Sequence, residues 1–416
     1  TRLQGDWSSD VCSSDLDAGN VHVVGVDGCV DGGDDLDEVV ARLFEDKEFR
    51  REANLGSVNS INWGRVCMQT VHYFHAYLAV VERVGDPVTF AVPTGAFGNL
   101  FAGYLASAMG LNPAVRLVAA TNANGAAHGA LKDGIWTRKP LISTPSTAID
   151  IAVPYNFWRV LYLATGGDAV TIKAMQDEYV KEGKVAIPPA ALARLREVFW
   201  SATVTDNQTL ETISSVFGGG GSGNGEEGYL MCPHTAVAMA SVSVPGLLHA
   251  GQSVIADSGS SSSSSPSPAA AAAAAAAVVV VATAHPCKFG ATVRRVLRLR
   301  DFDPLPLAAR HHSVDDAAAA NGRFQRHRVC ALEHLESALR RSIMAVRDER
   351  VKQSDNISLH RHHHHHHKHR HEQHHNRGRV RVVPRHRLEA NVTRAAARAA
   401  VSAAFVALAR GDVINP

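Results

Sequence analysis

The sequence predicts an α/β protein built on a parallel sheet with helices on its faces. Between residues 20 and 150, strand-like hydrophobic runs alternate with amphipathic helical segments, and short loops join them. Strand–helix–strand units with short loops form parallel sheets. The chain has 416 residues, of which 45% are hydrophobic, so it is long enough for two or three globular domains.

The N-terminal elements follow from short hydrophobic patterns. Residues 20–26 (NVHVVGV) have the pattern of a buried strand. Residues 34–46 (DDLDEVVARLFED) are predicted to form a helix with Asp34 at its N-terminal cap. Residues 60–85 are predicted to form a second, longer helix that ends at Gly85.

The elements that follow continue the alternation of strand and helix. We expect a strand at 87–92 (PVTFAV), a helix at 99–110 that ends at a glycine, and a strand at 114–122 (AVRLVAATN). Residues 146–215 are predicted to be mostly helical, and the segment IPPAALARLREVFW places proline at a helix start.

Composition divides the chain into four regions. Residues 6–16 (DWSSDVCSSDL) have neither a helical nor a strand period and resemble a translated sequencing-library adapter. A glycine-rich segment and a Ser/Pro/Ala run cannot bury a core. We therefore expect a non-native leader at 1–19, an α/β domain at 20–150, a helical segment at 151–297 that returns to that domain and carries insertions at 217–228 and 257–276, and an Arg/Ala/His-rich region at 298–416 that is disordered or out of frame.

Charge and cysteine usage exclude several classes of protein. From Arg294 onward the chain holds about 24 Lys and Arg against about 12 Asp and Glu, whereas the preceding part carries about −10. Six scattered cysteines without CxxC spacing favour a reducing compartment and argue against a zinc site. No apolar run reaches membrane-spanning length and no signal peptide is visible, so we expect a cytoplasmic protein, with a plastid as the alternative.

The basic tail contains six consecutive histidines at 362–367. Nothing in the surrounding sequence fixes their geometry or supplies acidic groups to orient the rings, so we expect no metal site. The arginine-rich flanks can contact phosphates, but they lack interleaved aromatic residues for base stacking. We therefore expect no specific nucleic-acid partner.

The segment VTFAVPTGAFGNLFAGYLASAMG predicts a phosphate-binding loop. Gly95 and Gly98 allow a sharp turn between a strand and a helix, and the free N–H groups of the helix start attract an anion. No Lys-Ser/Thr follows, and the spacing does not fit the dinucleotide fingerprint. The alternative is an ordinary tight turn of a doubly wound domain.

A second anion site is predicted at the start of the long helix. Asn59, Ser60 and Asn62 supply amide and hydroxyl donors there, and Arg65 lies one turn further on. The alternative interpretation makes Ser60 an N-terminal cap and Arg65 a surface charge. Two anion sites within about 40 residues suggest two different phosphates.

Six segments together resemble threonine synthase of the larger fungal and bacterial type, in that family's order and over roughly residues 20–293. They are LGSVNSINWGR, VPTGAFGNLFAGYLASAMGL, STPSTAIDIAVPYNFWRVLY, LREVFWSATVTDNQTLETI, GYLMCPHTAVA and ATAHPCKF. The resemblance implies the tryptophan-synthase-β fold (PLP fold type II), in which residues 20–150 belong to the pyridoxal 5′-phosphate domain. It also implies conversion of O-phospho-L-homoserine and water to L-threonine and phosphate.

The resemblance assigns roles to particular residues. The cofactor-binding residues it implies are Gly95, Phe97, Gly98, Asn99 and Thr235, with Thr235 at the pyridine nitrogen. The residues it implies for the phosphate of the small-molecule substrate are Asn59, Ser60 and Arg65.

The chain departs from the family pattern in three places. The family's Schiff-base lysine lies in a PTxxFKD-like motif upstream of the NSIN segment, and no such motif is present; Lys47 and Lys132 have other contexts. We therefore expect no catalytic lysine and interpret the chain as an N-terminally truncated, inactive fragment. Ala96 stands where the pattern has asparagine, and Cys232 stands where an acid is expected.

Two other functions stay open at this point. In the first alternative, the chain is a non-catalytic phosphate- or cofactor-binding protein that uses its basic, His-rich tail for partners. In the second, it is a related pyridoxal-phosphate phospho-lyase. An upstream lysine motif in a full-length transcript distinguishes the enzyme from the binding protein. Threonine formation distinguishes the synthase from the lyase, which releases ketobutyrate.

Overall fold

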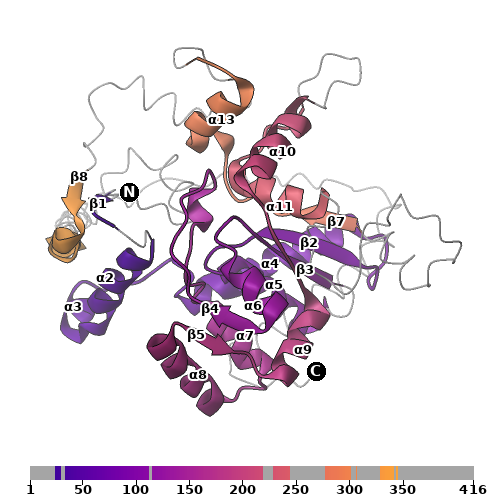
Figure 1. Ribbon diagram of the computed structural model, residues 1–416. Helices are drawn as coiled ribbons and strands as arrows, with labels where there is room; N and C mark the ends of the chain where they lie inside the picture. The colour runs from indigo at the N-terminus through magenta and orange to yellow at the C-terminus, as the bar shows by residue number, and fades with distance from the viewer. Residues whose placement is uncertain are drawn as a thin grey trace, which may run out of the picture. The chain divides into compact units, whose positions relative to one another are not determined.

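The structure is a computed structural model that describes residues 24–29, 33–111, 115–218, 228–243, 277–300, 306, 328–341 and 343–344 (Figure 1). The chain divides into two compact units, one of residues 1–45 and 56–335 and the other of residues 46–55 and 336–416. The predicted leader at 1–19 and the insertion at 257–276 lie outside the described residues, as do 219–227 of the other insertion.

The first unit contains a four-stranded parallel sheet in the order β6-β3-β2-β7. Its strands are β2 (Val88–Pro93), β3 (Val115–Thr121), β6 (Phe199–Thr203) and β7 (Ala277–Val280). In register, Val88 of β2 pairs with Val115 of β3 and with Ala277 of β7. The predicted α/β class with a parallel sheet is therefore confirmed.

Helices cover both faces of this sheet because its strands are hydrophobic on both sides. Phe90 and Val92 point into one core with α4 (Trp63–Val80), α5 (Gly98–Ala106), α6 (Ala126–Asp133), α7 (Phe157–Ala164) and α9 (Pro189–Val198). Ala91 points into a second core with α11 (Pro233–Ser243). Figure 1 shows α11 on one side of β2 and β3 and α5 and α6 on the other.

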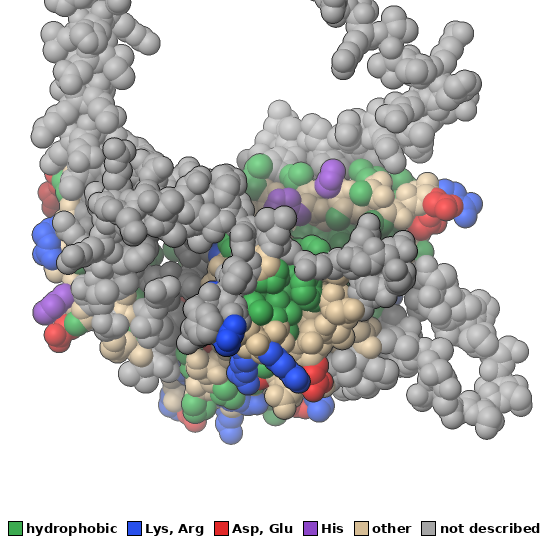
Figure 2. Space-filling view, turned by 90° about the horizontal axis from the view of Figure 1, so that it is seen from above, with side chains coloured by type: hydrophobic (Ala, Val, Ile, Leu, Met, Phe, Trp, Pro, Cys, Tyr) green, Lys and Arg blue, Asp and Glu red, His purple; other side chains and the backbone are tan. Residues whose placement is uncertain are grey.

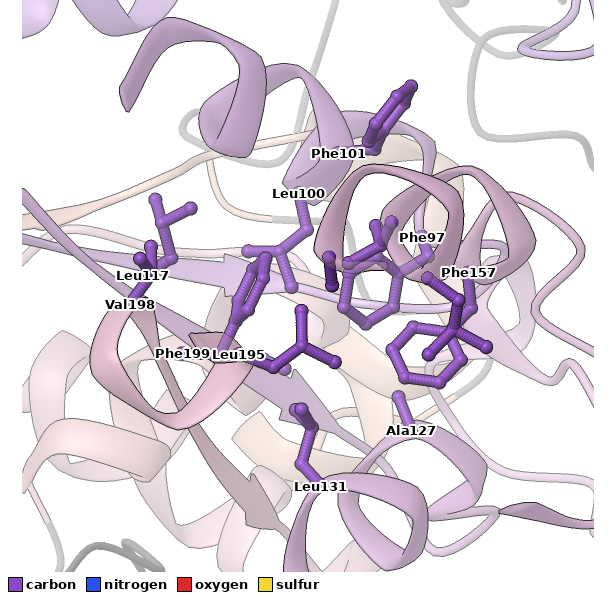
Figure 3. Close-up of a cluster of buried hydrophobic side chains, with 14 of the residues drawn as sticks. Phe97, Leu100, Phe101, Leu117, Ala127, Leu131, Phe157, Leu195, Val198 and Phe199 are labelled. Atoms are coloured by element: carbon purple, nitrogen blue, oxygen red, sulfur yellow. The ribbon is translucent and has the colours of Figure 1, made fainter. Parts of the chain in front are cut away.

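Aromatic rings fill the first core (Figure 3). The Phe97 ring centroid lies 5.1 Å from that of Phe157 and 5.7 Å from that of Phe199. The ring centroid of Trp136 lies 5.2 Å from that of Phe157. These side chains tie the residue before α5 to α7 and β6, so the glycine loop has a rigid base.

Two predicted helix ends differ from the structure. The long helix ends at Val80 instead of Gly85, because the Tyr77 hydroxyl donates to the Asp86 carbonyl at 3.1 Å and accepts from the Gly85 N–H at 2.8 Å. That hydroxyl stabilises a separate turn after the helix. The α-helical part of α5 ends at Ala106, and a π-helical turn, η1 (Ser107–Leu111), carries the chain through Gly110.

A strand is present in the described part of the predicted segment 20–26, but it does not join the main sheet. It forms β1 (Val24–Asp27), which pairs in parallel with β8 (Arg328–Ala331). Leu335, just after the turn η5 (Leu332–His334), is fully buried. This described stretch of the tail is therefore ordered, which differs from the unpacked chain expected for 298–416; the domain boundaries themselves stay predictions.

The first unit contains further helices and strands. The helix α2 begins at Gly33, one residue before the predicted cap Asp34. Further bounds are α2 (Gly33–Glu45), β4 (Ile135–Thr137) antiparallel to β5 (Lys184–Ala186), η2 (Thr147–Ile149), α8 (Ala169–Glu182), α10 (Asp206–Gly218), η3 (Pro286–Phe289) and α13 (Gly290–Leu297).

The second unit contains α3 (Lys47–Glu52), capped by Asp46. Arg340 of the same unit forms an ion pair with Asp46 at 2.8 Å, and its guanidinium lies 4.5 Å from the Phe49 ring centroid. This contact, which is cation–π in character, covers Phe49 and holds α3 against residue 340.

Hydrophobic side chains also reach the surface of the molecule. Met68 and Val71 of α4 are 61% and 44% exposed. Figure 2 shows one face on which hydrophobic side chains gather in a patch with lysine and arginine side chains beside it. Among the described residues, no helix is both long and apolar enough to span a bilayer.

Candidate anion-binding site

The direction of the strand order reverses between β2 and β7. From β2 the chain moves through β3 to β6 on one side, and β7 lies on the other side of β2. Ligands of doubly wound sheets bind at such a reversal, outside the carboxyl ends of the strands. The glycine loop follows β2 directly, and residues 281–289 follow β7.

The first turn of α5 has no side-chain cap. Phe97 precedes α5 with a left-handed backbone (φ 68°) and no side chain caps the helix, whereas Asn62 caps α4 and Asp168 caps α8. Gly98 and Leu100 are buried, so an anion is the natural partner for the free N–H groups of this turn. The Phe97 side chain lies in the aromatic core, so only its backbone faces the loop.

The Tyr73 hydroxyl fixes the oxygen end of the Asn99 side chain. The buried Tyr73 hydroxyl donates to the Asn99 Oδ1 at 2.8 Å and to its backbone carbonyl at 3.0 Å. The amide nitrogen therefore points away from Tyr73 and remains as a donor for a ligand.

The two predicted anion loops are in contact. A Cβ atom built on Gly98 would lie 2.7 Å from the Ser60 Cβ and 3.0 Å from its Oγ. Tyr155 joins the contact, because its hydroxyl donates to Asn59 Oδ1 at 2.8 Å and lies 2.9 Å from Ser60 Oγ. Asn59, Ser60 and Gly98 are thus brought together.

Arg65, in the first turn of α4, contacts the loop that carries Ser60. Its Nη1 donates to the Val58 carbonyl at 2.9 Å, and its side chain is half-buried. Asn62 rather than Ser60 caps α4, since its Oδ1 accepts from the Gly64 N–H at 2.9 Å. The cap interpretation of Ser60 is therefore wrong, and the Ser60 hydroxyl is left to the loop contacts.

The start of α11 lies at the same edge of the sheet. The His234 Nε2 accepts from the Ala148 N–H at 3.0 Å, and Ile149 Cα lies 2.9 Å from a Cβ built on Gly95. The turn η2 therefore lies between the glycine loop and the PHT segment. Thr235 is buried, and its hydroxyl lies 3.2 Å from Cys232 Sγ.

A buried polar cluster holds η2 in place. Asp150 Oδ1 accepts from Asn122 Nδ2 at 2.7 Å and from the Thr144 hydroxyl at 2.7 Å, while Asp150 Oδ2 accepts from the Thr144 N–H at 2.9 Å. Asn124 Nδ2 and Ser146 complete the cluster. Asn122 comes directly after β3, so the cluster fixes the chain at the carboxyl edge.

Asn156 and Arg159 also belong to this site, although neither was predicted from the sequence. Arg159 donates to the Ser60 carbonyl at 2.6 Å and to the Ile61 carbonyl at 2.8 Å. The only sequence signal was their position three residues apart at a helix start within YNFWRV. Their partners in the Ser60 loop lie almost 100 residues earlier, so no local pattern reveals them.

The charges at the site favour an anion. Partial burial lowers the pKa of Arg159, but the group remains a cation, and it forms no ion pair within the described part of the chain. Burial lowers the pKa of His234 to about 4, so its ring is neutral at pH 7. Burial, the largest cause, raises the pKa of Asp150.

These features define a doubly wound α/β protein with a candidate anion site at the switch point of its sheet. The chain is similar to threonine synthases. It is 38% identical to threonine synthase-like 2 of Pongo abelii over 225 residues, which is 53% of this chain and 44% of that protein. It is 37% identical to threonine synthase of Pseudomonas aeruginosa over 221 residues, 52% of this chain and 44% of that enzyme.

A solved structure shares the fold. The crystal structure of PLP-bound threonine synthase from Brucella melitensis aligns with a TM-score of 0.57 and 30% identity, covering 78% of this chain and 61% of that one. The chain spans about half the length of the curated relatives it matches. No protein-family model matches it. The resemblance to threonine synthases seen in the sequence motifs is confirmed.

Proposed function

We propose that this chain is threonine synthase-like: it binds pyridoxal 5′-phosphate and belongs to the carbon–oxygen lyases that convert O-phospho-L-homoserine and water to L-threonine and phosphate. The observation that supports this most is the uncapped, buried start of α5 in contact with Ser60. One phosphate is assigned to each of the two loops that meet there.

The residues present fit the cofactor. The N–H groups of Gly98 and Asn99 and the Asn99 side-chain amide would hold its phosphate, with Gly95 and Phe97 shaping the loop. The Thr235 hydroxyl would meet the pyridine nitrogen. The bound cofactor supplies an electron sink for the carbanion formed at the substrate's Cα.

The Ser60 loop would hold the substrate's phosphate. Asn59 and Ser60 supply side-chain donors, and Arg65 and Arg159 supply positive charge around the loop. Fixed donors of this kind stabilise an anion as it leaves, because they need no reorganisation when the charge develops.

We further propose that the 416-residue chain alone does not turn over substrate. It contains no lysine in a PTxxFKD-like context, and Ala96 lacks the amide that the family pattern places there. Loss of a hydrogen bond to a charged group costs about 1.5–3 kcal/mol, which weakens phosphate binding about 10- to 100-fold without abolishing it.

Calorimetric titration of the purified chain with pyridoxal 5′-phosphate and with pyridoxal tests the proposal. We expect the phosphorylated cofactor to bind more tightly, no cofactor-labelled peptide after borohydride reduction, and no threonine formed from O-phospho-L-homoserine. Threonine formation or a labelled lysine would overturn the proposed inactivity, and ketobutyrate release would favour a phospho-lyase. Failure of the phosphorylated cofactor to bind would overturn the proposal as a whole.

A further inference from the structure

Asn156 contacts both anion loops at once. It is fully buried just before α7, and its Nδ2 donates to Ser60 Oγ at 3.0 Å and to the Ala96 carbonyl at 2.8 Å. Its backbone N–H donates to the same Ala96 carbonyl at 3.2 Å. One side chain therefore links the loop before α4 to the loop before α5.

Arg159 fixes the orientation of that side chain. Its Nη1 donates to Asn156 Oδ1 at 2.7 Å, and a guanidinium can only donate. The oxygen of the amide must therefore face Arg159, and both amide hydrogens must face the two loops. Arg159 also holds the Ser60 and Ile61 carbonyls, so the loop cannot move without breaking these bonds.

Gly98, Ser60 and Asn156 pack so closely that the two loops have little room to move independently. Asn156 Nδ2 lies 3.2 Å from a Cβ built on Gly98, and Ser60 lies even closer to that position. A shift of the Ser60 loop would therefore change the Asn156 amide, the Ala96 carbonyl and the start of α5 together. Packed contacts of this kind transmit a displacement from one loop to the next.

We infer that Asn156 is a positioning residue that couples the two anion-binding loops, so that the phosphate of the cofactor is held well only while the Ser60 loop is in place. The inference rests on the proposed function. It predicts that a change in Ser60, which belongs to the substrate loop, weakens cofactor binding through Asn156.

A double-mutant cycle tests the coupling. The variants are Ser60→Ala, Asn156→Asp and their combination. Aspartate has nearly the same shape as asparagine, and its carboxylate can accept from Arg159. Because it has no N–H group, it cannot donate to Ser60 or Ala96. The measured quantity is the affinity for pyridoxal 5′-phosphate divided by that for pyridoxal, which isolates the contribution of the phosphate. Asn207→Ala, at an exposed position of α10, is the matched control.

We expect each single variant to lower this ratio about tenfold, the loss of roughly one hydrogen bond near a charged group, and the double variant to lower it no further. Additive losses, or an unchanged ratio in folded variants, would overturn the coupling while leaving the proposed function intact. Failure of the unaltered chain to bind the phosphorylated cofactor would overturn both.

Discussion

Ser60 and Gly98 are in van der Waals contact, although Ser60 precedes α4, Gly98 begins α5, and the two lie far apart in the sequence. A methyl group on Gly98 would lie 2.7 Å from the Ser60 Cβ, closer than two carbon atoms pack. We propose that this contact joins into one site two loops that each bind an anion.

The first prediction concerns Gly98→Ala. The new methyl must displace Ser60, which costs about 1–3 kcal/mol of stability as overpacking. The displacement should also weaken binding of pyridoxal 5′-phosphate about tenfold or more, since the donors of α5 and Ser60 no longer converge. Urea unfolding and calorimetric titration measure the two effects.

Gly129→Ala is the matched control for Gly98→Ala. Gly129 lies in α6, and nothing approaches a Cβ at this position within 4 Å. The substitution should be neutral or should stabilise the chain by about 0.5–1 kcal/mol, the usual gain for alanine over glycine in a helix. Equal behaviour of the two variants would contradict the steric argument.

The second prediction concerns stability at acidic pH. Burial lowers the pKa of His234 from 6.5 to about 4, so between these pH values the unfolded chain binds a proton that the folded chain excludes. Stability should therefore fall as the pH drops from about 7 to 4, by up to about 3 kcal/mol from this group.

His234→Gln separates this effect from other titrations. The glutamine oxygen can accept from the Ala148 N–H but does not titrate. The variant should show a shallower loss of stability between pH 7 and 4, measured by urea unfolding at each pH. Parallel curves for the two proteins would mean that His234 is not the group responsible. Asp150, whose raised pKa acts in the opposite direction, is common to both chains.

The third prediction concerns the cluster around Asp150. Asn122→Ala removes donors to Asp150, Thr144 and Ser146 and leaves buried acceptors with fewer partners. It should destabilise the chain by about 1–3 kcal/mol. Lys173→Ala, which breaks only the exposed ion pair with Asp177, should change stability by less than about 1 kcal/mol. Denaturant midpoints compare the two, and equal effects would show that the cluster does not stabilise the loop.

The fourth prediction concerns Cys232. Its Sγ accepts from the Thr235 N–H at 3.4 Å and therefore occupies the capping position of α11. Cys232→Ala should lower stability by about 1 kcal/mol, whereas Cys232→Ser, which supplies a better acceptor, should not. Thermal melts of the three chains are the measurement, and an alanine variant as stable as the serine variant would exclude a capping role.

The local parts of the fold could be predicted from the sequence. The strand, glycine loop and helix around Gly95 and Gly98 form one continuous segment, and its hydrophobic run and glycine spacing specify it without distant partners. The sequence predicted a phosphate for each of the loops that carry Ser60 and Gly98, whereas the contact between these two residues comes from packing.

Features that depend on distant partners could not be predicted. β1 pairs with β8, about 300 residues later in a region whose composition predicts disorder. The end of α4 depends on the Tyr77 hydroxyl, which accepts a hydrogen bond from the Gly85 N–H and so stabilises a separate turn after the helix. Asn156 and Arg159 act on a loop that precedes them by almost 100 residues, and hydrogen bonds of that range leave no local periodic pattern.

We propose that the Ser60 loop and the start of α5 meet in one site that holds two phosphates, the cofactor's at α5 and the substrate's at the Ser60 loop. A crystal structure of this chain grown with pyridoxal 5′-phosphate tests it most directly. We expect the cofactor's phosphate to accept from the N–H groups of Gly98 and Asn99 while Ser60 remains against Gly98. A phosphate bound elsewhere, or a Ser60 loop separated from Gly98 in the bound chain, would contradict it.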